Sequence, residues 1–153
     1  MPNSKDVPIH AIWLAQDDPK KNTAVKLSKR KSLKLHERFT KLPRRGIILE
    51  PLCGKVLGPE DHALLLEEGG SIVGLDCSWA QIEESVQVVM RKTRLKPRML
   101  PLLLAANPVN WGKPSKLTTA EAIAASLYLI GNEKQARDLL SAFNWGEQFF
   151  VLN

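Results

Sequence analysis

Short apolar runs alternate with amphipathic or turn-rich segments along the first two thirds of the chain. Apolar runs of this length, bounded by turn residues, are typical of strands that are buried on both faces. They predict strands at residues 7–15, 45–51, 71–78 and 99–108. Such strands, separated by helices, indicate a parallel sheet and therefore an α/β fold with flanking helices and a helical C-terminal part.

Helix-start signals and the helical spacing of apolar residues mark the remaining segments. Thr118 with Glu121, and Ser78 with Gln81, have the spacing of capping boxes. An apolar tail at 146–153 is expected to pack on the rest of the protein. The predicted helices cover residues 22–35, 58–68, 79–93, 118–131 and 132–143, the first of them either as a helix alone or as a helix with a loop.

Length and composition favour one soluble domain. The chain has 153 residues, of which 44% are hydrophobic. No apolar run approaches the roughly 20 residues of a membrane span, and the N-terminal segment lacks the features of a secretory signal, so we expect a cytoplasmic protein. Cys53 and Cys77 lack the spacing of a zinc site, so we expect two reduced, buried thiols and no metal.

Basic residues are concentrated in two clusters. Between Lys20 and Arg45 there are eleven lysines and arginines against one acid, Glu37, and a second cluster of five runs from Arg91 to Arg98. Such clusters favour nucleic acid as a partner, with a solvated helix face as the alternative. The candidate RNA-binding residues are Lys20, Lys21, Lys26, Lys29, Arg30, Lys31, Lys34, Arg44, Arg45, Arg91 and Arg94.

The apolar run at 71–78 ends in the sequence LDCSW, which places Asp76 and Trp79 at the end of a predicted strand. A carboxylate at the last buried position of a strand must be matched by hydrogen-bond donors or by a ligand. Neighbouring backbone amides could satisfy Asp76, and Trp79 could simply pack in the core. Ligands of parallel sheets bind at the carboxyl ends of the strands, so this segment is also a candidate site.

Three longer motifs resemble those of the ribosomal-RNA aminocarboxypropyltransferases, a branch of the SPOUT-type knotted enzymes. They are LDCSW at 75–79, RMLPLLLAANPVNWGKP at 98–114 and LTTAEAIAASLYLIG at 117–131, and the segments DPKKNT and LGPED fit the same family. The resemblance implies transfer of the 3-amino-3-carboxypropyl group of S-adenosylmethionine to N3 of a uridine, or of N1-methylpseudouridine, in small-subunit rRNA during ribosome biogenesis. It also implies a SPOUT-like sheet with a C-terminal trefoil knot and, because the chain lacks a long acidic extension, an archaeal-type minimal member.

The same resemblance implies a site for S-adenosylmethionine, with no metal. The residues that it assigns to this site are Thr23, Leu49, Pro51, Leu75, Trp79, Leu100, Ser115, Leu117 and Ala122. In family members apolar side chains enclose the adenosine, the main chain at Leu75 holds the ribose hydroxyls, and that at Leu100 and Ser115 holds the adenine edge. The position of Thr23 holds the carboxylate of the transferred arm.

Asp76 is the candidate catalytic residue, because uracil N3 must lose a proton to become a good nucleophile. Its carboxylate could take up that proton or only orient the base. This chain departs from the common family pattern at three positions: Asn22 stands where cysteine is frequent, and Trp111 and Ser115 stand where tyrosine is frequent.

The motifs suggest two parts packed as one monomeric globule. Residues 1–97 would form an N-terminal α/β part with the basic RNA-binding face, and residues 98–153 a mainly helical part that carries the cofactor loop.

Two other functions share these features. A noncatalytic ribosome-assembly factor would use only the basic face, and a SPOUT-type RNA methyltransferase would present a different carbon of the same cofactor. In each case the expected partner is small-subunit rRNA or a pre-ribosomal particle.

Overall fold

The computed structural model describes residues 6–14, 22–77 and 79–153. Its centre is a five-stranded sheet in which every pair of neighbouring strands is parallel. The strands are β1 Ile9–Trp13, β2 Lys34–His36, β3 Gly46–Leu49, β4 Ser71–Asp76 and β5 Lys96–Arg98, in the order β2-β1-β4-β3-β5. This confirms the parallel α/β fold that the apolar runs predict.

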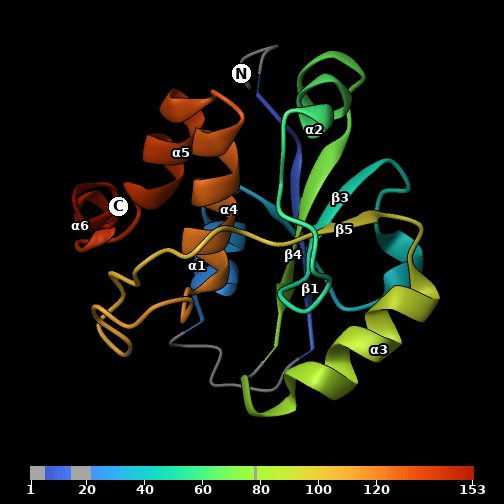
Figure 1. The fold of residues 1–153 in the computed structure, drawn as a ribbon, viewed down its shortest axis with the longest axis horizontal. Helices are drawn as coiled ribbons and strands as arrows, with labels where there is room; N and C mark the ends of the chain where they lie inside the picture. The colour runs from blue at the N-terminus through green and yellow to red at the C-terminus, as the bar shows by residue number, and fades with distance from the viewer. Residues whose placement is uncertain (1–5, 15–21, 78) are drawn as a thin grey trace.

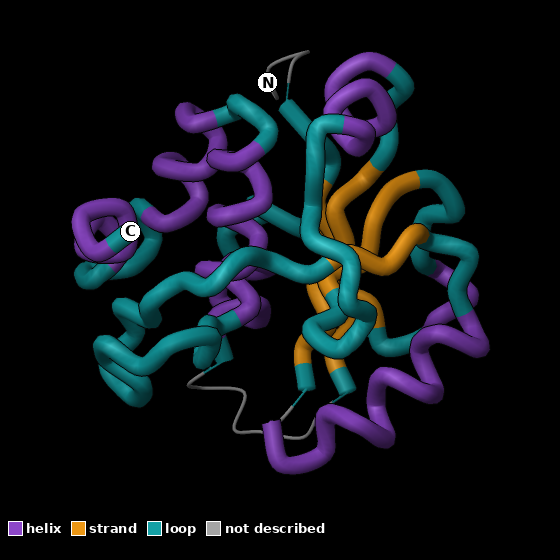
Figure 2. Tube along the Cα trace, in the orientation of Figure 1, coloured by secondary structure: helices purple, strands orange, loops and turns teal. Residues whose placement is uncertain are grey.

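Helices cover both faces of the sheet. In Figure 1, α1, α4 and α5 lie on one face and α3 lies on the other, and Figure 2 shows the long loops that connect these layers. The helical elements are α1 Thr23–Lys29, η2 Phe39–Lys41, α2 Glu60–His62, η3 Ala63–Glu67, η4 Trp79–Gln81, α3 Ile82–Lys92, α4 Thr119–Leu129, α5 Glu133–Leu140 and α6 Gly146–Leu152.

Each face of the sheet has its own apolar core. Successive side chains of a strand point to opposite faces, so Ile47 enters the core beneath α1 and α4, whereas Ile48 enters the core beneath α3. The first core is the larger and also contains Leu127 of α4 and Phe149 of α6. Because both faces are covered, the three inner strands β1, β3 and β4 consist mainly of apolar residues, whereas the edge strands β2 and β5 are more polar.

Gly74 allows α4 to pack directly on β4. A Cβ atom at this position would lie 2.8 Å from Thr119 Cγ2 and 3.1 Å from Ile123 Cδ1, so a larger residue would push the helix away. The first turn of α4 therefore lies at the carboxyl end of β4. This close approach brings Thr119 within hydrogen-bonding distance of Asp76.

The strands predicted at 7–15, 45–51 and 71–78 are confirmed as β1, β3 and β4. The sequence pattern did not reveal β2, which has only three residues and pairs only with β1 at the edge of the sheet. Its single apolar residue, Leu35, lies between Lys34 and His36. One apolar residue between two polar residues is too short a pattern to indicate a strand within a basic segment.

The strand predicted at 99–108 is wrong. The fifth strand is β5, and the residues after it form a loop that reaches Thr118, with only isolated bridges at Met99 and Leu104. Pro101 has no amide hydrogen to donate to a neighbouring strand, and Leu102 is 76% exposed. The apolar residues of this segment therefore cover the end of the sheet and do not extend it.

The loop that replaces the predicted strand is fixed by its own main chain and by the C-terminal helix. Ala105 N donates to Lys113 O, and Ser115 N donates to Leu103 O. The side chain of Asn153 accepts a hydrogen bond from Leu104 N at 2.7 Å and donates one to Leu104 O at 3.0 Å. We refer to residues 99–118 as the crossing loop.

The predicted helices are largely confirmed. Segments 79–93, 118–131 and 132–143 contain α3, α4 and α5, and the capping box of Thr118 and Glu121 is present at the start of α4. The basic segment 22–35 gives α1, a turn and the start of β2, the segment from residue 58 gives α2 and η3, and the apolar tail forms α6. Ser78, the other predicted cap, lies outside the described residues.

Cys53 and Cys77 are not joined in a disulfide, and both are partly exposed, which corrects the expectation that they are buried. Within the described ranges no cluster of His, Cys, Asp and Glu side chains could hold a metal ion. The helices of those ranges are also too short or too polar to cross a membrane.

A pair of histidines joins β1 to β2. His10 Nδ1 lies 2.9 Å from His36 Nε2, and the two rings are stacked with centroids 5.1 Å apart. Burial, then the neighbouring His36 and Lys34, lower the pKa of His10 from 6.5 to about 4. Burial and Lys34 also lower the pKa of His36. The folded protein therefore holds His10 neutral under mildly acidic conditions.

This pair predicts a loss of stability on acidification. Between pH 6.5 and about 4 the unfolded chain binds a proton at His10 that the folded chain excludes, so the free energy of unfolding falls as the pH falls. Because His10 is only half-buried and solvent screens part of the interaction, we expect a loss of about 1–2 kcal/mol from this residue across the interval. Urea unfolding at pH 7 and at pH 4.5 would measure it.

A His10→Gln variant should show a smaller loss between the two pH values, because glutamine can still bond to His36 but does not titrate. His62→Gln, on α2 and outside the stacked pair, is the matched control and should behave like the wild type. Equal losses in His10→Gln and the wild type would contradict the assignment.

Candidate active site

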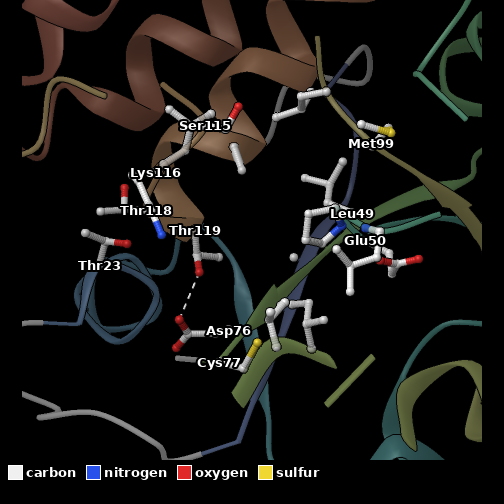
Figure 3. A pocket seen from close by; sticks show the side chains of 18 of the residues that line it. Thr23, Leu49, Glu50, Asp76, Cys77, Met99, Ser115, Lys116, Thr118 and Thr119 are labelled. Atoms are coloured by element: carbon white, nitrogen blue, oxygen red, sulfur yellow. Dashed lines mark hydrogen bonds between the residues drawn. The ribbon is translucent and has the colours of Figure 1, made fainter. Parts of the chain in front are cut away.

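A cavity of about 410 Å³ lies at the carboxyl ends of β3 and β4. Figure 3 shows the polar residues Thr23, Thr118 and Thr119 on one side and Leu49 with Met99 on the other. The walls come from the start of α1, the segments that follow β3 and β4, and the crossing loop with the first turn of α4. A cavity of this size and position is typical of small-molecule sites in parallel α/β folds.

The structure brings together almost all of the residues that were assigned to the cofactor. Eight of the nine line this one cavity, as does Asp76. The ninth is Trp79, whose side chain lies outside what the structure describes. The lining members are Thr23, Leu49, Pro51, Leu75, Leu100, Ser115, Leu117 and Ala122.

Asp76 is held by two side chains from other parts of the chain. Asn22 Nδ2 donates to Asp76 Oδ2 at 2.5 Å, and Thr119 Oγ1 donates to Asp76 Oδ1 at 2.9 Å. The carboxylate is only 8% exposed. Side-chain donors from α1 and α4 therefore hold this strand-end carboxylate and fix the direction of its oxygens within the cavity.

Asn22 has a second function at the same place. Its Oδ1 accepts a hydrogen bond from Val25 N at 2.9 Å, which caps the start of α1. The same amide thus positions both α1 and Asp76. Sequence reasoning noted Asn22 only as a departure from the family pattern; its N-cap position before Thr23 was the signal that could have drawn attention to it.

A contact between helix ends joins α1 to α4 beside the cavity. Ala120 N, in the first turn of α4, donates to Thr23 Oγ1 at 3.2 Å. Thr23 is the residue expected to hold the carboxylate of the transferred arm. Because a hydroxyl can donate one hydrogen bond while accepting others, this contact leaves the hydroxyl hydrogen of Thr23 able to donate to a ligand.

Glu121 fixes the crossing loop to α4. Its fully buried carboxylate accepts hydrogen bonds from Ala106 N at 2.6 Å, Asn107 Nδ2 at 2.7 Å and Thr118 N at 2.9 Å. Asn107 also donates to Lys116 O at 3.2 Å. Asn107, the asparagine of the AANP motif, therefore has a structural role, because it links the crossing loop to the cap of α4.

The structure also reveals a buried carboxylate that the sequence analysis missed. Glu50 follows β3, is 3% exposed and lines the cavity. Its Oε1 accepts a hydrogen bond from Leu52 N. Burial raises the pKa of the Glu50 carboxyl, and the Leu52 amide opposes that rise only in part. Glu50 therefore adds a second acidic group to the cavity.

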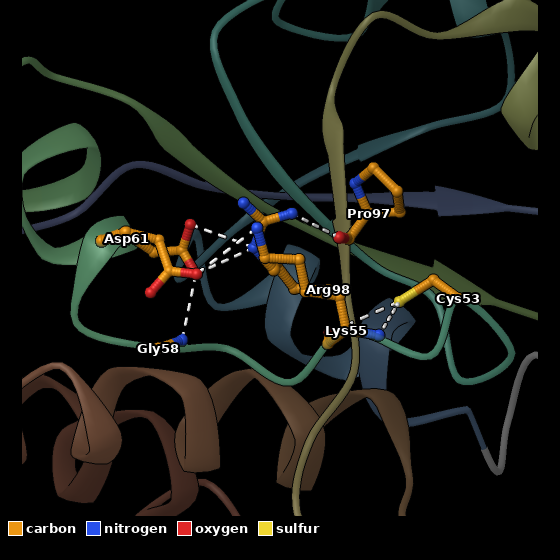
Figure 4. A network of polar contacts seen from close by, with 7 residues as sticks. Cys53, Lys55, Gly58, Asp61, Pro97 and Arg98 are labelled. Carbon is orange, nitrogen blue, oxygen red and sulfur yellow. Dashed lines mark hydrogen bonds and ion pairs between the residues drawn. The ribbon is translucent and has the colours of Figure 1, made fainter.

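A buried ion pair joins β5 to α2, and its arginine lines the cavity. Arg98 Nε lies 2.9 Å from Asp61 Oδ2, with side chains 8% and 2% exposed, and Asp61 also accepts from Gly58 N at 3.1 Å (Figure 4). Arg98 Nη1 donates to Pro97 O at 2.7 Å. Breaking a buried pair by removing one partner typically costs about 3–5 kcal/mol, so this contact holds α2 firmly against β5.

The candidate RNA-binding residues do not gather on one face. Lys26 and Lys29 lie on α1 and Arg91 lies on α3, on opposite faces of the sheet (Figure 1). Arg44 and Arg45 precede the amino end of β3, away from the cavity. The nine candidates that the structure describes are all exposed, and Lys20 and Lys21 lie outside the described residues.

Comparisons with known proteins show what the chain is similar to. Residues 47–153 match the family model described as "Ribosome biogenesis protein, C-terminal". The chain is 42% identical over 151 residues to the 16S rRNA aminocarboxypropyltransferase of Methanosarcina acetivorans, covering 99% of this chain and 83% of that protein. It is 39% identical over 140 residues to the protein of the same name from Vulcanisaeta distributa, covering 92% and 74%.

A solved structure agrees with these relatives. The SAM-dependent rRNA:acp-transferase Tsr3 from Vulcanisaeta distributa superposes with a TM-score of 0.88 at 37% sequence identity, covering 96% of this chain and 78% of that one. The five-stranded parallel sheet and its flanking helices are therefore those of a known enzyme fold. Together these similarities show that the chain belongs to the 16S rRNA aminocarboxypropyltransferase family.

Proposed function

We propose that this protein transfers the 3-amino-3-carboxypropyl group of S-adenosylmethionine to N3 of a uridine, or of N1-methylpseudouridine, in small-subunit rRNA. The observation that carries the proposal is the single cavity that joins Asp76 to eight residues expected to bind the cofactor. The family supports the same activity, because relatives named 16S rRNA aminocarboxypropyltransferase align with nearly the whole chain.

The cavity suits S-adenosylmethionine in its chemistry. Leu49, Leu100 and Leu117 provide apolar surface that can enclose an adenine ring. The polar side chains of Thr23, Thr119 and Asp76 gather at one end, where a charged arm can be held (Figure 3). The volume is also within the range of about 300–1,000 Å³ that is typical of such ligands.

The residues of this chain would position the reacting groups. When the cofactor is bound, its sulfonium makes the adjoining arm carbon electrophilic, so attack by N3 breaks the carbon–sulfur bond and releases neutral methylthioadenosine. Asp76 accepts the proton from N3 and passes it to water, and Asn22 with Thr119 keeps the carboxylate in position. The apolar walls hold the adenosine, so only the carbon in line with the nucleophile reacts.

Basic residues outside the cavity would bind rRNA phosphates. Lys26 and Lys29 of α1, which begins at Thr23, are the described candidates nearest the cavity along the chain. Lys20 and Lys21 precede this helix and belong to the same proposal. Arg30, Lys31, Lys34, Arg44, Arg45, Arg91 and Arg94 would contact parts of the RNA farther from the target base, because they lie beyond the end of α1 or near the amino ends of the strands.

We include four further features in the proposal. They are a trefoil knot in the C-terminal part, which the family implies, a monomer, a cytoplasmic location and an rRNA substrate within a pre-ribosomal particle. The chain path supports the knot, because the crossing loop leaves edge strand β5, lines the cavity at the ends of β3 and β4, and then enters α4. We also retain the division into residues 1–97 and 98–153, packed together.

Separate isotopic labels test the reaction. We expect purified protein, mixed with small-subunit rRNA from a strain that lacks the enzyme, to incorporate label from the carboxyl carbon of S-adenosylmethionine and to leave methyl label in methylthioadenosine. Entry of methyl label would identify a methyltransferase and overturn the proposal. Tight RNA binding without entry of either label would identify a noncatalytic assembly factor.

An Asp76→Asn variant tests the catalytic role. We expect transfer at saturating cofactor to fall by about 100-fold, because the amide cannot accept the N3 proton. Methylthioadenosine, which lacks the arm, should bind within about threefold of the wild type, as calorimetry can measure. Asp138→Asn, at an exposed position on α5, is the control. Unchanged transfer with intact binding would remove Asp76 from the mechanism.

A further inference from the structure

The crossing loop carries a tryptophan that is not packed into either core. Trp111 is 52% exposed, and none of the aromatic ring contacts among the described residues includes its indole. A single exposed apolar side chain is common on protein surfaces. An indole, however, offers a large flat surface, and the place and the neighbours of Trp111 favour one kind of ligand for it.

Main-chain hydrogen bonds hold the tip of the loop, residues 110–113, in place. Lys113 N donates to Asn110 O at 2.9 Å, which closes a turn with Trp111 and Gly112 at its two central positions. Gly112 has a φ of 74°, in the left-handed region that glycine adopts without strain. Gly112 N also donates to Ala105 O at 2.7 Å. The main chain thus forms this turn without any packing of the indole.

The tip lies at the rim of the cavity. Asn110, which precedes Trp111, lines the cavity, and so does Ser115, which follows the tip. Trp111 itself is not among the lining residues, so its indole lies outside the space proposed for the cofactor. An RNA strand that delivers a base into the cavity carries the neighbouring nucleotides along this rim.

The charge of the loop is suited to RNA. Residues 99–117 contain two lysines, Lys113 and Lys116, and no aspartate or glutamate. Both lysines are exposed. Ammonium groups beside an exposed aromatic ring are typical of surfaces that bind single-stranded nucleic acid, because the ammonium groups contact phosphates and the bases stack on the ring. A protein partner would instead need acidic groups opposite the two lysines.

We propose that Trp111 stacks on a nucleobase of the rRNA beside the target uridine, with Lys113 contacting an adjoining phosphate. This inference rests on the proposed function. A base that enters an enzyme's cavity leaves the stack, so the base next to it loses its stacking partner. The indole replaces that partner and lowers the free-energy cost of turning the target out. Because every base has a flat face, Trp111 contributes affinity and position, and not sequence recognition.

A Trp111→Ala variant tests this inference through RNA binding. We expect its affinity for a short fluorescein-labelled single-stranded RNA to fall by about tenfold, the effect of a lost base–aromatic stack. Fluorescence anisotropy measures this affinity. Trp111→Tyr should keep most of the affinity, because a phenol ring also stacks. Calorimetry with methylthioadenosine should give an affinity within about twofold of the wild type for both variants, since Trp111 does not line the cavity.

The dependence of RNA binding on salt separates stacking from phosphate contact. Lys113→Met should reduce the slope of log affinity against log salt by about 0.7, the value for one phosphate contact on a single strand. Trp111→Ala should weaken binding at every salt concentration without changing this slope, because the indole carries no charge. Inorganic polyphosphate, which has charges but no bases, should bind Trp111→Ala as tightly as it binds the wild type.

Leu102→Ala is the matched control for loss of apolar surface. Leu102 is 76% exposed on the same loop but has no ring, so this variant should bind RNA within about twofold of the wild type. Equal weakening in Leu102→Ala and Trp111→Ala would show general apolar contact, and unchanged RNA affinity in Trp111→Ala would assign the tip to a protein partner. Either result would overturn the inference. The labelled-transfer assay is independent, because carboxyl label can enter rRNA without this stack.

Discussion

The buried carboxylate of Glu121 is the constraint on which the cavity depends. It completes the cap of α4 and holds Ala106 and Asn107 of the crossing loop through hydrogen bonds of 2.6 and 2.7 Å. Loss of this acceptor would leave several buried donors without partners, at a cost of about 1–3 kcal/mol for each. The position of the loop, and with it one wall of the cavity, follows from this single side chain.

The remaining parts of the site come from the sheet and from the ends of two helices. β3 and β4 provide rigid apolar surface and carry Asp76 at their carboxyl edge, while α1 and α4 provide the polar groups. This arrangement requires Gly74, because the absence of a side chain lets the first turn of α4 approach β4 closely enough for Thr119 to donate a hydrogen bond to Asp76. Three elements far apart in sequence thus fix one carboxylate, which is the kind of preorganisation that a transfer reaction requires.

Sequence patterns predicted the parts of this fold that depend on local chemistry. The capping box at Thr118 and the apolar run of β4 could be read directly. The crossing loop could not, because apolar residues that cover a cavity have the same pattern as a buried strand. The bond between Asn22 and Asp76 joins positions 54 residues apart, and no periodicity indicates it. The residues proposed to bind the cofactor were predicted only through resemblance to a family, because their common location in one cavity appears only after folding.

The anchoring of the crossing loop by Asn153 has a consequence for the timing of activity. The side chain of Asn153 holds the main chain of Leu104 from 49 residues away, and α6 must pack before it can do so. A growing chain must therefore extend through α6 and Asn153 before one wall of the cavity is secured. A ligand that binds only the folded form gives no stability to a chain whose synthesis has not yet reached α6.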